Sequence, residues 1–268
     1  MTLHSRHWVF LGLFVLIGVA MALRYRPKVD VSPNTNAMHA YIDSLPKGSI
    51  IIVSFDHEAS SLPEVRPIAL ALLRHAFSRG HKLVGVALLA EGTVIGYRLL
   101  QTVADEYDLE YGKDYAYLGF KPQYIAAILS MGESIRGTYP EDYAGRPYEQ
   151  IEMLQNIGNY DDIAAVMSIA DGSLTTHWIE YGGRYNLPVL AGVTAAMVTT
   201  YDPYLSSGQL KEMIGGLRGA AEYEKLIGQS GGGARAMLAQ TMAHLYVIAL
   251  VVLGNILYFR SRRTGMKQ

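Results

Sequence analysis

The sequence of 268 residues contains no cysteine. This absence excludes disulfide scaffolds, thiol nucleophiles and cysteine metal sites, and it fits an oxidising compartment. An excess of charge of one sign is also missing, because 23 basic residues face 24 acidic residues and the formal net charge is -1. A nucleic-acid-binding surface needs concentrated positive charge, so we expect no nucleic-acid partner.

Several motifs of known chemistry are absent as well. The chain contains no G-x-x-x-x-G-K-[ST] phosphate-binding loop, and it shows no internal repeat or low-complexity segment. No glycine-flanked serine follows an expected strand, as a G-x-S-x-G nucleophile turn requires. Gly215, Gly216 and Gly219 are expected inside a helix, whereas a dinucleotide-binding fingerprint needs a strand-to-helix turn. The sequence therefore indicates no nucleotide-binding motif.

Long apolar stretches lie near the two ends of the chain. Residues 8–23 and 242–259 contain no Asp, Glu, Lys or Arg, and basic residues follow each stretch. A membrane-spanning helix needs roughly 17 to 25 apolar residues. We expect one transmembrane helix at each end. For residues 8–23 we prefer an anchor to a cleaved signal peptide, although Ala20-Met21-Ala22 resembles a cleavage site.

The basic residues after the second stretch predict the orientation in the membrane. Cytoplasmic ends of membrane helices carry an excess of Lys and Arg, and this tail contains Arg260, Arg262, Arg263 and Lys267. With two spans, both termini are expected in the cytoplasm. The expectation is a two-pass protein of the cell membrane, with its soluble domain on the extracytoplasmic side.

Between the apolar ends, short apolar runs alternate with longer amphipathic segments. We expect strands at residues 50–53, 82–89, 115–120, 163–170 and 189–195, and helices at residues 63–79, 93–107, 123–135, 148–157, 174–185 and 208–227. Such alternation predicts an α/β fold with a doubly wound, Rossmann-like, mainly parallel sheet of about five strands. The expected parts are an N-terminal anchor at 1–28, a linker at 29–48, the α/β domain at 49–228, and a glycine-rich joint with the C-terminal membrane helix and basic tail at 229–268.

Polar side chains follow the expected strands at their carboxyl ends, where open α/β sheets bind ligands. The candidates for catalysis are Asp56, Glu58, Lys121 and Asp171. The hydroxyl-bearing candidates for binding are Ser60, Ser61, Thr93, Ser173, Thr176 and Thr194. Carboxylates, a lysine and hydroxyls together can hold Mg²⁺ and a phosphate group.

The order of these residues resembles that of the haloacid-dehalogenase-like phosphohydrolases. That family has an acidic pair after the first strand, a Ser or Thr after the second, then a lysine and an acidic-Gly turn. Here Asp56 and Glu58, Thr93, Lys121 and Asp171-Gly172 stand in those places. The resemblance implies Mg²⁺-dependent hydrolysis of phosphoesters. The pattern is broken, because glutamate replaces the second aspartate, a histidine separates the pair and no further carboxylate closely follows the turn. We therefore do not assign the chain to that family.

Small and polar residues near the second apolar stretch predict lateral assembly. Each glycine in a helix interior costs about 0.5 to 1 kcal/mol, so three in one helix indicate close approach of another backbone. Polar residues on one stripe of a membrane helix normally face another helix. The glycines are Gly215, Gly216 and Gly219, and the polar residues are Gln240, His244 and Asn255. We expect these residues to form contacts in a homo-oligomer, with contacts inside one chain as the alternative.

Three functional hypotheses follow from these patterns. The leading one is a non-catalytic, membrane-anchored α/β scaffold that assembles into homo-oligomers, with no cofactor and no metal site. A phosphohydrolase acting through Asp56 is the first alternative, and Mg²⁺ is the cofactor that it implies. An extracytoplasmic solute-binding or sensory module is the second, with an unidentified small-molecule ligand at the same strand ends.

Overall fold

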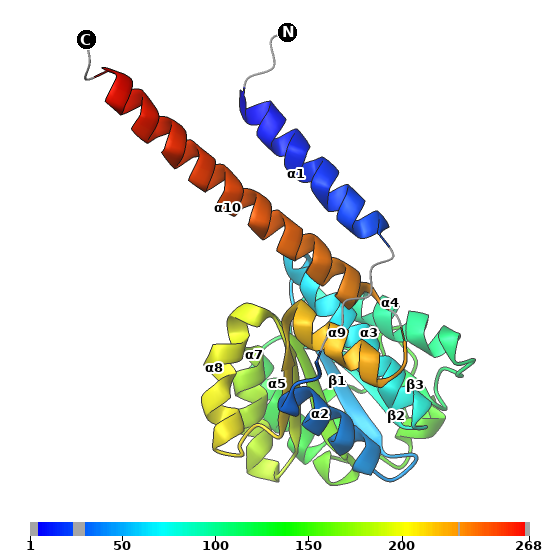
Figure 1. The fold of residues 1–268 in the computed structure, drawn as a ribbon. Coiled ribbons are helices and arrows are strands. Elements are labelled where there is room, and N and C mark those ends of the chain that lie inside the picture. The colour runs from blue at the N-terminus through cyan, green and yellow to red at the C-terminus, as the bar shows by residue number, and fades with distance from the viewer. Residues whose placement is uncertain (1–4, 24–29, 230, 266–268) are drawn as a thin grey trace. The chain divides into compact units, whose positions relative to one another are not determined.

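The computed structural model describes residues 5–23, 30–229 and 231–265 (Figure 1). The chain divides into two compact units. One unit comprises Val29–Gly233, and the other comprises the terminal segments Met1–Lys28 and Ala234–Gln268. The larger unit is an α/β domain.

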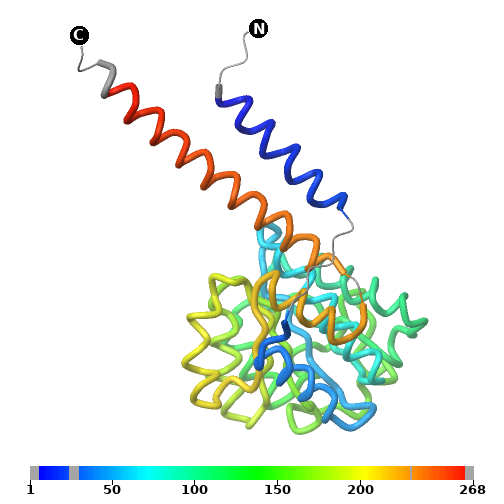
Figure 2. The backbone as a smooth tube through the Cα atoms, viewed as in Figure 1, coloured from blue at the N-terminus to red at the C-terminus, as the bar shows by residue number. Residues whose placement is uncertain are grey.

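Six parallel strands form one sheet in this domain. They are β1 Ile50–Asp56, β2 Lys82–Ala87, β3 Tyr115–Phe120, β4 Ala165–Ala170, β5 Val189–Val193 and β6 Glu212–Gly215. Their order is β3-β2-β1-β4-β5-β6, and every neighbouring pair runs parallel. The chain winds from β1 to β2 and β3 and then returns to the other side of β1 for β4, so the winding reverses beside β1 (Figure 2). The expected doubly wound, Rossmann-like sheet is confirmed, with one strand more than expected.

The continuous apolar run of β1 explains its central position. Ile51, Ile52 and Val53 are fully buried. Ile52 enters one core, whereas Ile51 and Val53 enter the other. A parallel strand covered on both faces needs such a run. The helices over the first core are α5 Tyr124–Glu133, α6 Ile135–Thr138, α7 Leu174–His177 and α8 Ala195–Ser206, and those over the second are α2 Pro33–Ser44, α3 Leu62–Ser78, α4 Gly92–Glu106 and α9 Gly216–Leu226.

The helices expected at 148–157 and 174–185 differ from the structure. The first is replaced by two 3-10 turns, Tyr148–Gln150 and Glu152–Leu154, because the fully buried Ile151 between them is extended. The second is helical throughout but changes type, from α7 through the π-helical segment Trp178–Gly182 to a 3-10 turn at Gly183–Tyr185.

The helix expected at 208–227 begins with a strand instead. β6 pairs with β5 and buries Met213 and Ile214, and α9 starts only at Gly216. Gly216 has φ +66°, a left-handed conformation that ends the strand and starts the helix. The prediction that three glycines lie inside one helix was therefore wrong. The sequence also did not reveal α8, which connects β5 to β6.

The segment expected as a linker at 29–48 contains α2, a helix of 12 residues. Ser32 caps its N-terminus, Pro33 is its first residue, and Met38 and Ile42 are fully buried in the second core. Glu222 of α9 accepts hydrogen bonds from the backbone N–H and the hydroxyl of Ser32 at 3.0 and 2.6 Å. This segment is therefore part of the domain.

The smaller unit contains α1 Ser5–Ala22 and most of α10 Gly232–Gly265. Among the described residues, one helix is long and apolar enough to cross a membrane, Gly232–Arg262, with mean hydropathy 2.0. The apolar helix Arg6–Ala22 is shorter. At 1.5 Å per residue such a helix reaches about 25 Å, less than the roughly 30 Å hydrocarbon core. The prediction of two membrane spans is thus corrected to one candidate span at the C-terminal end.

Candidate functional site

The loops that leave the carboxyl ends of β1 and β4 meet where the winding direction reverses. Open parallel sheets bind ligands at such a switch point. The backbone N–H of Glu58, which follows β1, donates a hydrogen bond of 2.8 Å to Asp171 Oδ2, which follows β4. This bond holds the two loops together at the switch point.

Asp56 ends β1 and is nearly fully buried, with 1% of its surface exposed. Its Oδ2 accepts hydrogen bonds from the Ser54 hydroxyl at 2.6 Å and from Trp178 Nε1 at 3.2 Å, and its Oδ1 accepts one from the Leu88 N–H at 2.8 Å. Burial raises the pKa of Asp56 to about 6, although these three donors oppose the increase. The carboxylate joins β1 to the loop after β2 and to the π-helical segment.

Other carboxylates at this edge also accept backbone N–H groups. Besides Asp171, Glu91 accepts from the Ala59 N–H at 3.3 Å and Glu64 accepts from the Ala195 N–H at 2.7 Å. Each of these bonds joins segments that follow different strands. The acidic side chains of the edge therefore position its loops relative to one another.

Buried polar atoms without a partner gather at the same edge. Among the described residues, five buried side-chain nitrogen or oxygen atoms have no hydrogen-bond partner. Four of them lie on segments that follow β1, β2, β3 and β4, namely His57 Nε2, Thr93 Oγ1, Tyr139 OH and His177 Nδ1. Each such atom costs about 1 to 3 kcal/mol when it stays unpaired. Buried polar atoms of this kind are candidates for hydrogen bonds to a bound molecule or to water.

His57 and Thr93 are brought together by the packing of α4 on β1. The backbone of Gly92, which precedes Thr93, lies so close to the carbonyl oxygens of Phe55 and His57 that a Cβ there would collide with Phe55. The residue His57 is fully buried, and its Nδ1 lies 3.3 Å from the Glu58 carbonyl oxygen. Burial lowers the pKa of His57, so its imidazole is neutral at neutral pH. Because the Glu58 carbonyl oxygen can only accept a hydrogen bond, the hydrogen of this ring is on Nδ1 and Nε2 is an acceptor.

Tyr139 and His177 extend the group to the other strand ends. Tyr139 lies beside Lys121, the first residue after β3, whose Nζ is 5.5 Å from the ring centroid and donates to the Thr138 carbonyl oxygen at 2.5 Å. Burial raises the pKa of Tyr139, and the negative charge of Asp56 raises it further. His177 stacks on Tyr124 with ring centroids 4.6 Å apart. The edge thus offers hydroxyl and imidazole groups between aromatic rings.

The two serines expected to bind a ligand after β1 make contacts within their own loop. Ser60 Oγ lies 3.4 Å from Glu58 Oε2, and the Ser61 hydroxyl donates to the Glu58 carbonyl oxygen at 2.9 Å. The Glu58 side chain is exposed. Both serines therefore shape the loop on the solvent side of the edge.

The remaining hydroxyl candidates follow other strands. Ser173 is exposed and occupies the N-cap position of α7, but its side chain makes no capping hydrogen bond. Thr176 lies within α7, and Thr194 is buried at the N-cap of α8, also without a side-chain cap. Of the six hydroxyl candidates, Thr93 is the one in the described chain with a buried, unpartnered oxygen.

The three glycines expected at an oligomer contact have neighbours within the chain. Gly215 packs against Val198 of α8, and a Cβ on Gly216 would lie 3.0 Å from the Ala195 Cβ and 3.2 Å from Glu64 Oε1. Gly219 faces Ile214 at ordinary contact distance. Neighbours within the same chain therefore explain the small residues at these three positions, and a second chain is not required to explain them.

The polar stripe expected in the membrane helix lies on α10. Gln240, His244 and Asn255 are exposed, and Asn255 Nδ2 donates to the carbonyl oxygen of Val251 in the same helix at 2.9 Å. The contact between α1 and α10 uses a different residue, since the Tyr246 hydroxyl donates to the Val9 carbonyl oxygen at 3.1 Å. The stripe does not provide that contact.

The candidates named from the sequence end or follow strands of one parallel sheet, as expected. The histidine between Asp56 and Glu58 was not among those candidates, and neither were Tyr139, His177 and Trp178. Tyr139 and His177 are separated from their strands by helical segments, so their sequence positions carry no signal of the site.

Comparison with known proteins does not assign a family. No protein-family model, no curated protein and no solved structure matches the chain. Its function is therefore argued from its own geometry.

Proposed function

We propose that the chain is a non-catalytic, membrane-tethered domain that binds a small polar molecule at the carboxyl edge of its sheet. The observation that carries this proposal is the set of four buried, unpartnered atoms on the segments that follow four adjacent strands: His57 Nε2, Thr93 Oγ1, Tyr139 OH and His177 Nδ1. A bound molecule with hydroxyl, amide or ring N–H groups supplies the missing hydrogen bonds. A receptor or sensor role is consistent with the tether.

The charge of the edge supports an uncharged ligand. Glu58, Glu91 and Asp171 bring negative charge to this edge, and the ammonium group of Lys121 is engaged by the Thr138 carbonyl oxygen. A phosphate ester would meet more negative than positive charge there. Imidazole and hydroxyl groups instead suit a ligand that both donates and accepts hydrogen bonds.

The hydrogen bonds that the Asp56 carboxylate accepts argue against the Mg²⁺-dependent phosphohydrolase hypothesis. Both carboxylate oxygens of Asp56 accept hydrogen bonds from buried donors. A metal ion on Oδ2 would have to displace the Ser54 hydroxyl or Trp178 Nε1, and each lost bond to a charged group costs about 1.5 to 3 kcal/mol. Oδ1 keeps one lone pair beside the Leu88 N–H, but the whole residue is only 1% exposed. Asp56 is better explained as the residue that positions three segments of the edge.

The proposed tether is α10. Its length and apolarity suit a membrane span, and basic residues follow its apolar stretch at Arg260, Arg262, Arg263 and Lys267. Such residues favour the cytoplasmic side. We infer a single C-terminal anchor with the α/β domain on the extracytoplasmic face of the cell membrane. Homo-oligomer formation through Gln240, His244 and Asn255 remains part of the proposal.

The fluorescence of Trp178 tests ligand binding. The chain has two tryptophans, so Trp8→Phe leaves Trp178 as the reporter beside Asp56. The full-length variant in mild detergent is titrated with D-glucose, myo-inositol, adenosine and uridine. We expect a saturable change in emission with at least one of these probes. Thr93→Val and Tyr139→Phe should each weaken that binding about fivefold to tenfold, the worth of one hydrogen bond.

Thr102→Val provides the matched control, because the exposed Thr102 hydroxyl donates to the Arg98 carbonyl oxygen of its own helix. It should leave the affinity unchanged. A flat response to all four probes contradicts the proposal. Mg²⁺-dependent release of phosphate from p-nitrophenyl phosphate, abolished by Asp56→Asn, would instead support the phosphohydrolase.

A further inference from the structure

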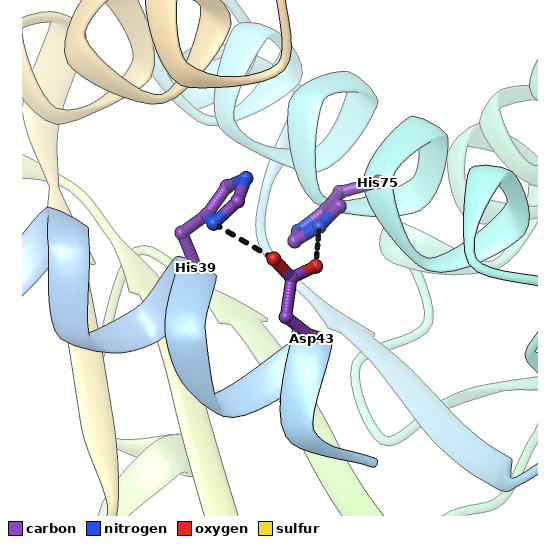
Figure 3. Close-up of side chains that lie close together, drawn as sticks. All are labelled: His39, Asp43 and His75. Carbon is purple, nitrogen blue, oxygen red and sulfur yellow. Dashed lines mark hydrogen bonds and ion pairs between the residues drawn. The ribbon is translucent and has the colours of Figure 1, made fainter. Parts of the chain in front are cut away.

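A second group of reactive side chains lies at the opposite edge of the sheet, where α2 meets α3 (Figure 3). His39 and Asp43 are one turn apart on α2, and His75 is near the end of α3. One possible ligand atom from each residue lies within 4.8 Å of the others. Asp43 Oδ1 is 2.8 Å from His75 Nε2, and Asp43 Oδ2 is 3.4 Å from His39 Nδ1.

Burial and hydrogen bonding differ across the three residues. The His75 side chain is 2% exposed, whereas His39 and Asp43 are 21% and 31% exposed. The second nitrogen of His75, Nδ1, lies 2.7 Å from the hydroxyl of the fully buried Tyr223. Metal-binding histidines are commonly oriented by such a partner on the other ring nitrogen. The cluster therefore combines one buried and oriented ligand residue, His75, with two ligand residues that solvent can reach, His39 and Asp43.

The protons on His75 allow two arrangements. A neutral imidazole carries one N–H and one lone pair. If Nε2 carries the hydrogen, it donates to Asp43 while the Tyr223 hydroxyl donates to Nδ1. If Nδ1 carries it and donates to Tyr223, two electron-pair donors, Nε2 and Asp43 Oδ1, face each other at 2.8 Å. A cation bound to both stabilises the second arrangement.

We propose that His39, Asp43 and His75 bind one divalent transition-metal ion of the Zn²⁺ class. Two imidazole nitrogens beside one carboxylate oxygen suit Zn²⁺ better than Mg²⁺ or Ca²⁺, which prefer oxygen ligands alone. Three protein ligands leave a fourth tetrahedral position for water. The site lies between two helices that are separate in sequence, so the ion would cross-link α2 to α3.

Two neighbouring groups must adjust when the ion binds. The His39 and His75 rings stack at 4.2 Å with an angle of 15° between their planes, so the partly exposed His39 ring has to rotate to direct Nδ1 at the same ion. Arg79 also binds Asp43, with Nε 2.5 Å from Oδ1 and Nη2 2.8 Å from Oδ2. The guanidinium therefore competes with the metal for Asp43.

Titration of the full-length protein with Zn²⁺ tests the site. The protein is prepared in mild detergent without a polyhistidine tag, and binding is measured by calorimetry. We expect one equivalent of Zn²⁺ to bind and to raise the unfolding temperature, because an ion that binds the folded chain stabilises it. Co²⁺ at the same site should give the intense visible bands of four-coordinate cobalt. His39→Ala should weaken Zn²⁺ binding at least tenfold.

Two further variants separate a metal site from a purely structural network. Tyr223→Phe should weaken binding about tenfold, since the partner that orients His75 is lost. Arg79→Gln should tighten binding at least threefold, because a competing positive charge is removed. The Arg79 side chain is 50% exposed, so its loss does not disturb a core. Asp202→Ala, which removes an exposed carboxylate on α8, is the control and should leave binding unchanged.

The proposal is overturned if Zn²⁺ binds no more tightly to the wild type than to His39→Ala. It is overturned equally if Arg79→Gln weakens Zn²⁺ binding, or if Co²⁺ shows only the faint bands of six-coordinate, water-like surroundings. Circular dichroism of each metal-free variant shows whether the fold is retained. If His39→Ala fails to fold, the sign of the Arg79→Gln effect decides.

Discussion

Asp56 shows how one buried carboxylate sets the stability of the sheet edge. Burial raises its pKa to about 6, compared with about 3.9 for an ordinary aspartate. The folded chain therefore binds this proton more tightly than the unfolded chain does. The contribution of Asp56 to the free energy of unfolding is largest near pH 4, falls as the pH rises to about 6, and is constant above that value.

Comparison of wild type with Asp56→Asn isolates this contribution. The pKa of His75, which burial lowers to about 4, has the opposite effect over the same pH range, but it is common to both proteins. Urea unfolding at about pH 4.5 and about pH 7 should show that the stability of wild type relative to Asp56→Asn decreases by about 2 kcal/mol at the higher pH. An equal difference at both pH values would show that Asp56 is not a buried, proton-binding group.

Thr93 provides a second test at the level of a single residue. Its buried hydroxyl oxygen has no partner, and valine has nearly the same shape without the hydroxyl. Thr93→Val should therefore raise the free energy of unfolding of ligand-free protein by about 1 kcal/mol. Thr102→Val, which loses a satisfied hydrogen bond, should be neutral or slightly destabilising. A clear loss of stability in Thr93→Val would mean that the hydroxyl already has a partner in the empty site.

At the level of elements, the sequence predicted best where an element is long and apolar. The five expected strands, including the fully buried run of β1, are present, because continuous apolar residues can be buried only in the centre of the sheet. β6 has four residues and its apolar pair is too short to separate from a helix. α2 has a clear start signal in Ser32-Pro33, but its prolines and asparagines favoured a linker.

The site was only partly predictable for a related reason. Residues that end a strand or immediately follow one, such as Asp56 and Asp171, are brought to one edge by the topology of any parallel sheet. Tyr139 reaches that edge only because α5 and α6 return the chain to Lys121, and Trp178 does so through a π-helical segment. Likewise, the pairing of His39 and Asp43 with His75 depends on the docking of α2. These contacts are tertiary and leave no spacing pattern.

Alanine substitutions at two glycines near the start of α9 should change the stability of the domain in opposite directions. Gly216 is buried with φ +66°, so Gly216→Ala should destabilise the domain by about 1 to 2 kcal/mol. Gly219 lies inside the helix with room for a Cβ, so Gly219→Ala should stabilise it by about 0.5 to 1 kcal/mol. Thermal unfolding of the wild type and of both variants measures these changes in stability. If both variants instead stay equally stable and form smaller particles, the glycines serve an oligomer contact.

At the level of the whole molecule, assembly depends on α10. A polar side chain facing lipid is unfavourable, and a facing helix can satisfy it for about 0.6 to 2 kcal/mol per hydrogen bond. If Asn255 serves this purpose, Asn255→Leu should reduce the particle mass in detergent, measured by light scattering, while the α/β domain stays folded. Val252→Leu is the control on the same helix. Unchanged mass in Asn255→Leu, or a monomeric wild type, would rule out assembly through this stripe.

The central claim is that the carboxyl edge of the sheet holds a small polar molecule. Native mass spectrometry of the full-length protein, purified in mild detergent, tests it most directly because no candidate ligand has to be chosen. We predict a species heavier than the chain by the mass of one small organic molecule, which is released on unfolding and is depleted in Thr93→Val and Tyr139→Phe. A folded wild-type protein that shows only the mass of its own chain, even after incubation with the four probes named above, would contradict the claim.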